Sequence, residues 1–224
     1  GRAYCYLPLP ISTGLRTHIH ASFALSSNRR DLWMADDLSG GGALKAQWNA
    51  HLLGTALPHC MASMLELLPA RISSMFRNDV KARAATIYAA LPDLELVKSP
   101  FEQMATRTIR EAARRDCTVL YDAGSREPWV RLSDAVFQDA EFAALFAGDS
   151  RVRQMMTTAD EVRLVSPPQF VCASLQKAGV AVRTTSPKMV SSMLQKHTLS
   201  KLLTKAQAHT LLTYLLHDFR SRKD

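Results

Sequence analysis

The sequence contains no long hydrophobic run and no closely spaced cysteines. Every apolar segment is shorter than the about 18 to 20 residues that a transmembrane helix needs, so we expect no membrane span within these residues. Cys5, Cys60, Cys117 and Cys172 lie too far apart in sequence for the paired spacing of zinc sites and redox motifs. Free buried thiols in a reducing compartment are the expected arrangement.

Acidic residues are absent from a long C-terminal segment. The chain has 224 residues and a formal net charge of +8, and no Asp or Glu occurs from Val162 to His217. Residues 162–224 carry 10 basic and 2 acidic side chains, whereas residues 1–161 carry 18 of each kind. This distribution predicts a basic face that can meet phosphates, nucleic acid or an acidic protein surface. Because aromatic residues are scarce there, docking on an acidic neighbour is favoured over nucleic-acid binding.

Recognisable catalytic motifs are missing as well. The glycines at 40–42 are followed by Ala-Leu-Lys45, not by the Gly-Lys-Ser/Thr of a phosphate-binding loop, and no G-x-S-x-G elbow occurs. His18 and His20 share one face of a predicted strand, but no third ligand is spaced nearby, so we expect no metal site. A complete active site is therefore not expected, and an enzymatic role stays open.

The residue patterns predict a mixed α/β (α+β) chain in three parts. Residues 1–38 contain strands, residues 39–115 are helical, and residues 116–224 form a small basic α/β module. The composition, with 47% hydrophobic and 21% charged residues, is that of a folded globular protein. Because Gly1 already stands in a strand-like pattern, we expect the chain to be part of a longer protein.

The first part is expected to contain two strands. Alternating patterns predict strands at 2–7 and 17–25 that can pair as a hairpin with a long connection. Pro8 and Pro10 are expected to end the first strand, because proline lacks an amide donor. A turn is predicted at Thr13 and Gly14.

The second part shows helical periodicity. A helix is predicted from residue 43 to about 68, kinked or divided by Pro58. Further helices are predicted at 70–76 and 79–91, and Ser99 is expected to cap another at 101–115. One side of that last helix is apolar and the other is basic. The residues of the basic stripe are Arg107, Arg110 and Arg114.

The third part alternates short strands with helices. A hairpin is predicted from strands at 117–121 and 129–132 around a polar turn. Gly179 is expected to end a helix that Pro167 and Pro168 begin, and Ser186 to cap the next one. The remaining predicted elements are a helix at 140–146, strands at 162–165 and 180–182, and a last helix at 205–219.

The stretch FALSSNRRDLW at 23–33 carries the strongest chemical signal. Arginine is always charged, and its planar guanidinium can bind a phosphate through two parallel hydrogen bonds. Arg29 and Arg30 at a strand end therefore suit delivery of positive charge to a developing phosphate anion, and Asn28 can accept a left-handed turn or donate its amide. In the alternative interpretation, one arginine forms a structural ion pair with a nearby carboxylate, namely Asp31, Asp36 or Asp37.

The first 53 residues also carry a distinctive order of short motifs. An aromatic strand ends in Leu-Pro-Leu-Pro at 1–10, Thr-Gly-Leu follows at 13–15, and Ser-Asn-Arg-Arg at 27–30 precedes Leu-Trp at 32–33. This order resembles the sacsin repeat region. The resemblance becomes thin after residue 53 and is absent at about 72–116. Other resembling residues are His18, His20, Trp48, Asn49, Leu52, Leu53, Trp129, Val130, Asp134, Ala135, Val136, Phe137, Pro167, Pro168, Leu212, Tyr214, Leu215 and Asp218.

The resemblance implies a place within a chaperone. Sacsin-like proteins are large cytoplasmic chaperones or co-chaperones whose repeats open with an ATP-binding domain of the heat-shock-protein-90 (GHKL) class. The chain would follow that domain, with ATP and Mg bound mainly by residues outside it. Residues 1–38 would be strands of a middle-domain-like sandwich.

The resemblance also implies roles for the loop residues. In the related heat-shock chaperone, a middle-domain loop sends an arginine to the γ-phosphate of ATP, with an asparagine a few residues earlier. Arg29 and Arg30 are the matching candidates for the phosphate contact, and Asn28 matches the asparagine. Which arginine reaches the phosphate stays open.

Two functions therefore remain open. In the first, the chain is a segment of a sacsin-like ATP-dependent chaperone or co-chaperone in the cytoplasm. It assists hydrolysis by the preceding nucleotide-binding domain and couples it to client proteins or other chaperones. In the second, it is a non-catalytic binding module. Its basic C-terminal quarter then docks an acidic protein partner or nucleic acid, and Arg29 and Arg30 are structural.

Overall fold

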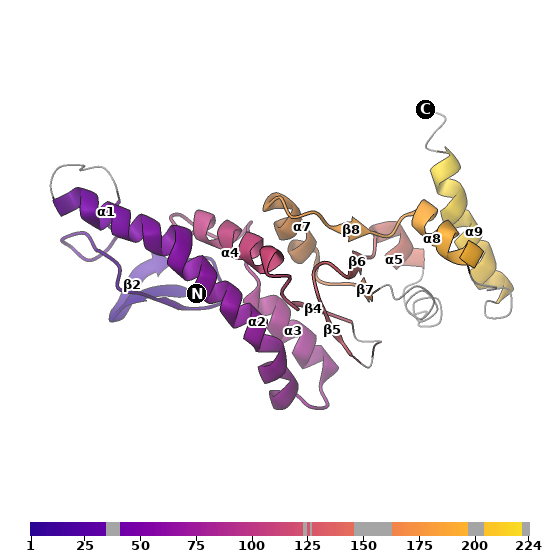
Figure 1. Cartoon of the computed structure of the whole chain (residues 1–224), viewed down its shortest axis with the longest axis horizontal. Coiled ribbons are helices and arrows are strands. Elements are labelled where there is room, and N and C mark those ends of the chain that lie inside the picture. The colour runs from indigo at the N-terminus through magenta and orange to yellow at the C-terminus, as the bar shows by residue number, and fades with distance from the viewer. Residues whose placement is uncertain (35–40, 123–124, 126, 146–162, 197–203, 221–224) are drawn as a thin grey trace. The chain divides into compact units, whose positions relative to one another are not determined.

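The computed structural model of the chain describes residues 1–34, 41–122, 125, 127–145, 163–196 and 204–220 (Figure 1). The chain divides into two compact units: unit 1 is Gly1–Val119 with Pro168–Ala181, and unit 2 is Leu120–Pro167 with Val182–Asp224. The predicted segments 1–38 and 39–115 lie together in unit 1, which also takes a helix from the predicted segment 116–224. The prediction of a mixed α/β chain is confirmed.

Unit 1 contains a three-stranded sheet in the order β2-β1-β3. The strands are β1 (Arg2–Cys5), β2 (Leu7–Ser12) and β3 (Ile19–His20). Strand β1 pairs with β2 in antiparallel and with β3 in parallel orientation. The prediction that the segment after residue 17 returns as the hairpin partner of β1 is therefore wrong, because β2 is that partner.

The expectation that Pro8 and Pro10 end the first strand is also wrong. Both prolines lie inside β2. Strand β2 lies at the edge of the sheet, so only one of its sides pairs with another strand of this sheet. Pro8 and Pro10 are two residues apart, so the two backbone positions that lack an N–H face the same side of β2. When that side is the unpaired one, the prolines cost the sheet no hydrogen bond. The predicted turn at Gly14 is confirmed: its φ is +74°, and a Cβ there would collide with the backbone of Leu96.

A long helical segment begins at residue 41 (Figure 1). It consists of α1 (Gly41–His51), a π-helical stretch η1 (Leu52–Ala56) and α2 (Leu57–Met75). The predicted interruption near Pro58 is confirmed, since the hydrogen-bonding pattern changes at η1 and Pro58 falls in the first turn of α2.

Three further helices complete unit 1. They are α3 (Val80–Ala90), α4 (Glu102–Arg114) and α7 (Gln169–Lys177). The apolar stripe predicted on α4 is confirmed by its buried residues, Met104, Ala105, Thr108, Ile109 and Ala112. The predicted Ser99 cap is wrong, because the residue preceding α4 is Phe101 and no side chain caps this end.

Unit 2 contains the predicted hairpin in shortened form. Strands β4 (Leu120–Tyr121) and β5 (Trp129–Val130) pair antiparallel. A separate three-stranded parallel sheet has the order β7-β6-β8. Its strands are β6 (Ala135–Phe137), β7 (Arg163–Val165) and β8 (Arg183–Thr184), so the strand predicted at 180–182 lies further along the chain.

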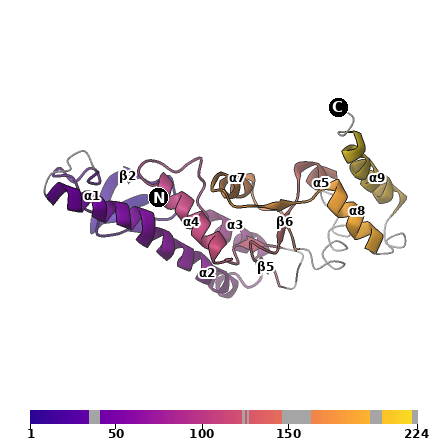
Figure 2. The same ribbon diagram turned by 45° about the horizontal axis from the view of Figure 1, so that its top comes forward.

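Three helices accompany this parallel sheet. They are α5 (Ala140–Leu145), α8 (Pro187–Lys196) and α9 (Lys205–Arg220). The predicted Ser186 cap is confirmed, since its hydroxyl accepts a hydrogen bond from the Met189 amide at 3.2 Å. Helices α8 and α9 lie side by side (Figure 2).

Other expectations about the whole chain have mixed outcomes. The described residues of unit 1 contain one sheet, so the chaperone middle-domain sandwich is not confirmed. All four cysteines are free, but only Cys5 and Cys117 are buried, whereas Cys172 is half-buried and Cys60 is exposed. None of the helices in the described part of the chain has the length and hydrophobicity needed to cross a membrane.

A partly buried polar cluster joins the sheet of unit 2 to its helices. Asp139, just after β6, accepts hydrogen bonds at 2.6 Å from both the Tyr214 hydroxyl on α9 and the Thr185 hydroxyl. Its other oxygen accepts the Phe142 amide of α5 at 2.8 Å. Burial raises the pKa of Asp139, but the hydrogen bonds from Thr185, Tyr214 and the amide lower it by more, so that the pKa lies below its ordinary value.

This cluster predicts an acid-sensitive unit 2. Because the pKa of Asp139 is lower in the folded than in the unfolded chain, its stabilisation is present above the unfolded value of about 3.9 and is lost as pH falls through the folded value. Tyr214→Phe should lower the free energy of unfolding by about 1.5 to 3 kcal/mol. Amide exchange of β6 measures both effects. Tyr6→Phe, at an exposed tyrosine of unit 1, is the control for the Tyr214 variant. If Asp139→Asn leaves the acid sensitivity of unit 2 unchanged, Asp139 is not its source.

Candidate functional site

The segment that carries the two arginines is a closed loop, here called the arginine loop (residues 26–31). An antiparallel bridge between Leu25 and Leu32 closes its base. Within it, the Ser26 amide donates to the Asp31 carbonyl at 3.0 Å, and the Asp31 amide donates to the Ser26 hydroxyl at 3.2 Å. The loop therefore has a fixed path rather than a free strand end.

Asn28 shapes the tip of the arginine loop. Its side-chain oxygen accepts the Ser26 hydroxyl at 2.7 Å and the Arg30 amide at 3.0 Å, as in an Asx-turn. The residue in the left-handed region is Arg29, with φ +56°, and not Asn28. Such a conformation costs about 1 to 2 kcal/mol for a residue with a Cβ. The loop interactions therefore hold Arg29 in a conformation that it would rarely adopt alone.

Helix α1 holds the base of the arginine loop through a buried asparagine. The Asn49 side-chain oxygen accepts the Ala24 amide at 2.9 Å, while its Nδ2 donates to the carbonyls of Ala24 at 2.7 Å and Trp33 at 3.0 Å. The neighbouring Trp48 donates its indole N–H to the Ser22 carbonyl at 2.7 Å. One amide side chain is thus hydrogen-bonded to both chain segments at the base of the loop.

The role of Asn49 is a finding that sequence reasoning missed. The available signal was a polar residue next to Trp48 in a helical pattern, in the part of the chain where the family resemblance is dense. Asn49 has no exposed surface, and a fully buried amide must find partners. Residue type alone does not reveal that those partners belong to a loop 16 to 25 residues earlier in the chain.

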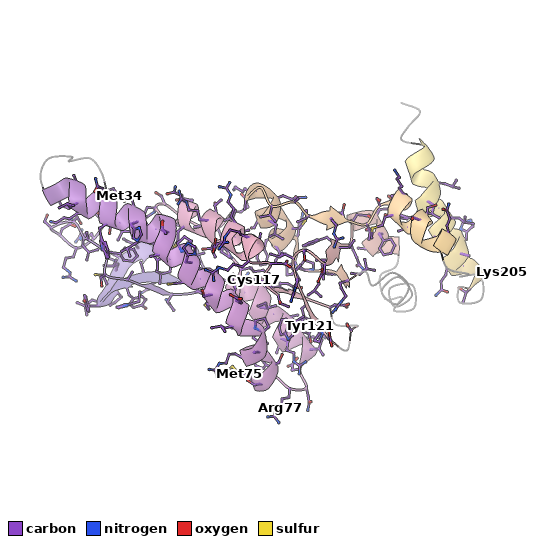
Figure 3. The ribbon with its side chains drawn as sticks, viewed as in Figure 1. Met34, Met75, Arg77, Cys117, Tyr121 and Lys205 are labelled. Atoms are coloured by element: carbon purple, nitrogen blue, oxygen red, sulfur yellow. The ribbon has the colours of Figure 1, made fainter. Side chains whose placement is uncertain are left out.

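The two guanidinium groups are exposed and lack a described counter-charge. Within the described residues, neither Arg29 nor Arg30 forms an ion pair, and Asp31 beside them uses its backbone to close the loop. Asp36 and Asp37 lie outside the described residues, so pairing with them stays a prediction. Met34, labelled in Figure 3, is the last described residue before that gap.

The histidines considered as metal ligands have structural contacts. His18 Nδ1 accepts the Arg2 amide and His20 Nε2 accepts the Tyr6 amide, each at 3.2 Å. Both imidazoles therefore complete hydrogen bonds of β1 and its turn. Among the residues that the structure describes, no group of three His, Cys, Asp or Glu side chains could hold a metal ion.

The basic C-terminal residues are shared between the two units. Lys177, in unit 1, pairs with Glu95 at 2.7 Å, while Arg163, in unit 2, lies 4.0 Å from Asp122. Arg183 donates to the Ser133 carbonyl. The predicted basic face is thus partly used in internal contacts, and its residues at 197–203 and 221–224 lie outside the described part.

Removal of the Asn49 amide should loosen the arginine loop. Asn49→Ala leaves the Ala24 amide and carbonyl without these partners, so the free energy of unfolding should fall by about 1 to 3 kcal/mol. Amide exchange at Ala24 and at Trp33, whose amide donates to the Ala24 carbonyl at 2.9 Å, should accelerate about ten-fold or more. Asn78→Ala, at an exposed asparagine, should change neither quantity. Equal exchange rates in the Asn49 and Asn78 variants would show that the Asn49 hydrogen bonds do not stabilise the base of the arginine loop.

The chain is similar to human sacsin. The two are 30% identical over 142 residues, which is 62% of this chain and 3% of sacsin. The chain thus matches a small part of a much longer protein, and a sacsin-related region is what this similarity supports. Assignment to the repeat region stays a prediction. No family model matches the chain, and no solved structure matches it.

Proposed function

We propose that this chain is a segment of a sacsin-like, ATP-dependent chaperone or co-chaperone and that its arginine loop assists ATP hydrolysis by a preceding nucleotide-binding domain. The observation that supports this proposal is the geometry of the arginine loop. Its base is held by Asn49, and its tip exposes Arg29 and Arg30 without a described counter-charge. The similarity to sacsin supports the chaperone context.

The geometry of the loop suits an arginine that acts on a neighbouring domain. A guanidinium presents paired N–H donors that match two oxygens of a phosphate group. Because Asn28 binds the Arg30 amide and α1 holds the loop base, the backbone of the loop is already ordered, and only the exposed guanidinium groups remain to be positioned when the loop meets its target. A positioned arginine of this kind contributes about 10³ to 10⁵ in rate where it has been measured.

An arginine supplied by a separate domain also links conformation to chemistry. Hydrolysis proceeds fast only when the domain that carries the arginine loop docks on the nucleotide-binding domain. In this proposal ATP and Mg²⁺ are bound by residues outside this chain, and docking couples hydrolysis to client proteins in the cytoplasm. The sheet β2-β1-β3 would be part of a middle-domain-like sandwich completed outside this chain.

Single-turnover hydrolysis in a longer protein that includes the preceding nucleotide-binding domain tests this function. Arg29→Ala or Arg30→Ala should slow hydrolysis ten-fold or more, which corresponds to about 1.4 kcal/mol of activation free energy. Nucleotide affinity should change much less, because the contact strengthens as charge develops in the transition state.

A matched variant separates this effect from a loss of positive charge. Arg71 is exposed on α2, and Arg71→Ala removes the same charge from another surface of unit 1. It should leave the rate unchanged. If both loop variants hydrolyse ATP at the wild-type rate while remaining folded, the arginine loop is structural and the proposed function fails.

A further inference from the structure

An open pocket of about 300 Å³ lies where the π-helical stretch η1 and the start of α2 face α4. Gly54 and Thr55 of η1 line one side of the pocket, and Arg107, Arg110 and Glu111 of α4 line the other. All of these residues belong to unit 1 and are separate from the arginine loop. Isolated π-helical turns of this kind occur frequently at functional sites.

Arg107 is held in this pocket by the π-helical backbone. Its Nη1 donates to the Gly54 carbonyl at 2.7 Å. A Cβ on residue 54 would lie 3.3 Å from that nitrogen, so glycine lets the guanidinium approach the helix closely. A single carbonyl occupies one of the five N–H donors of the arginine, which leaves the others for a ligand.

Arg110, one helical turn further along α4, is held in the same manner. Its Nε donates to the carbonyl of Ala178 at the end of α7 at 2.7 Å. Two guanidinium groups on the same pocket are thus oriented by neutral carbonyls. In the described parts of the chain neither of them forms an ion pair, so their charges are not compensated.

The one carboxylate of the pocket is already neutralised. Glu111 Oε1 lies 2.8 Å from both Arg114 Nη2 and Arg115 Nε, and 3.0 Å from His59 Nδ1. Hydrogen bonds from Arg114 and then Arg115 lower the pKa of Glu111 to about 2. Arg115 also lies 3.6 Å from Glu66, so Arg114 and Arg115 together balance these two carboxylates, and the positive charges of Arg107 and Arg110 remain in excess.

We propose that this pocket binds a phosphate group through Arg107 and Arg110. Two oriented guanidinium groups suit a compact dianion better than a single-charged carboxylate, because each fork can engage two phosphate oxygens. The volume lies at the lower end of the range of about 300 to 1,000 Å³ for ligand pockets, which fits a small group. Free phosphate and a phosphate ester share this chemistry.

Titration of the 224-residue chain with inorganic phosphate tests the pocket, with the arginine Nε–Hε signals followed by NMR at constant ionic strength. Saturable shifts should appear at Arg107 and Arg110, and acetate should not saturate them. Arg107→Gln and Arg110→Gln should each weaken binding ten-fold or more, whereas Arg71→Gln, which removes the same charge from α2, should not. O-phosphoserine distinguishes the sources: it also saturates the site if phosphate esters are accepted, and fails to do so if only free phosphate fits.

Absence of saturable shifts in the wild-type chain would overturn the proposal, as would equal binding of acetate and phosphate. Arg107→Lys retains the charge and one donor to Gly54 but loses the fork, so it should bind phosphate more weakly than wild type even where the glutamine variants fold poorly. An Arg107→Lys variant with wild-type affinity would also overturn the proposal, because a point charge would then be sufficient without the arginine fork.

Discussion

The buried side chain of Asn49 is the interaction on which the candidate site depends. It exchanges hydrogen bonds with the backbone of Ala24 and donates to Trp33, so one residue of α1 joins the two chain segments that flank the arginine loop. Short loops on a two-residue bridge are weakly ordered by themselves. The helix therefore supplies the rigidity that the strand segments lack, and it makes the exposed arginines a defined feature of the surface.

Much of the helical structure and part of the site could be predicted from the sequence. The apolar stripe of α4 and the loop carrying Asn28, Arg29 and Arg30 follow from local patterns, because burial and turn chemistry act over a few residues. The pairing of β1 with β2 could not be predicted, since two prolines disfavour a strand unless it lies at a sheet edge. The roles of Asn49 and Arg107 depend on distant partners that local patterns do not reveal.

The arginines of unit 1 illustrate why residue type alone does not assign a role. Arg114 and Arg115 neutralise Glu111, and Arg107 and Arg110 bind backbone carbonyls. These contacts use guanidinium donors without removing the positive charge of Arg107 and Arg110. An arginine held by a neutral carbonyl is oriented and still electrostatically active, whereas one paired with a carboxylate is largely neutralised. This distinction separates the pocket on α4 from a structural ion-pair network.

In the proposed function, the arginine loop reaches the nucleotide of a preceding domain. The most direct test is a structure of the longer protein, containing that domain, bound to a non-hydrolysable ATP analogue. In that structure a guanidinium nitrogen of Arg29 or Arg30 should lie about 3 Å from a γ-phosphate oxygen, with the Asn49 contacts intact. A closed, nucleotide-bound state in which both guanidinium groups face solvent or a carboxylate of the same chain would contradict it.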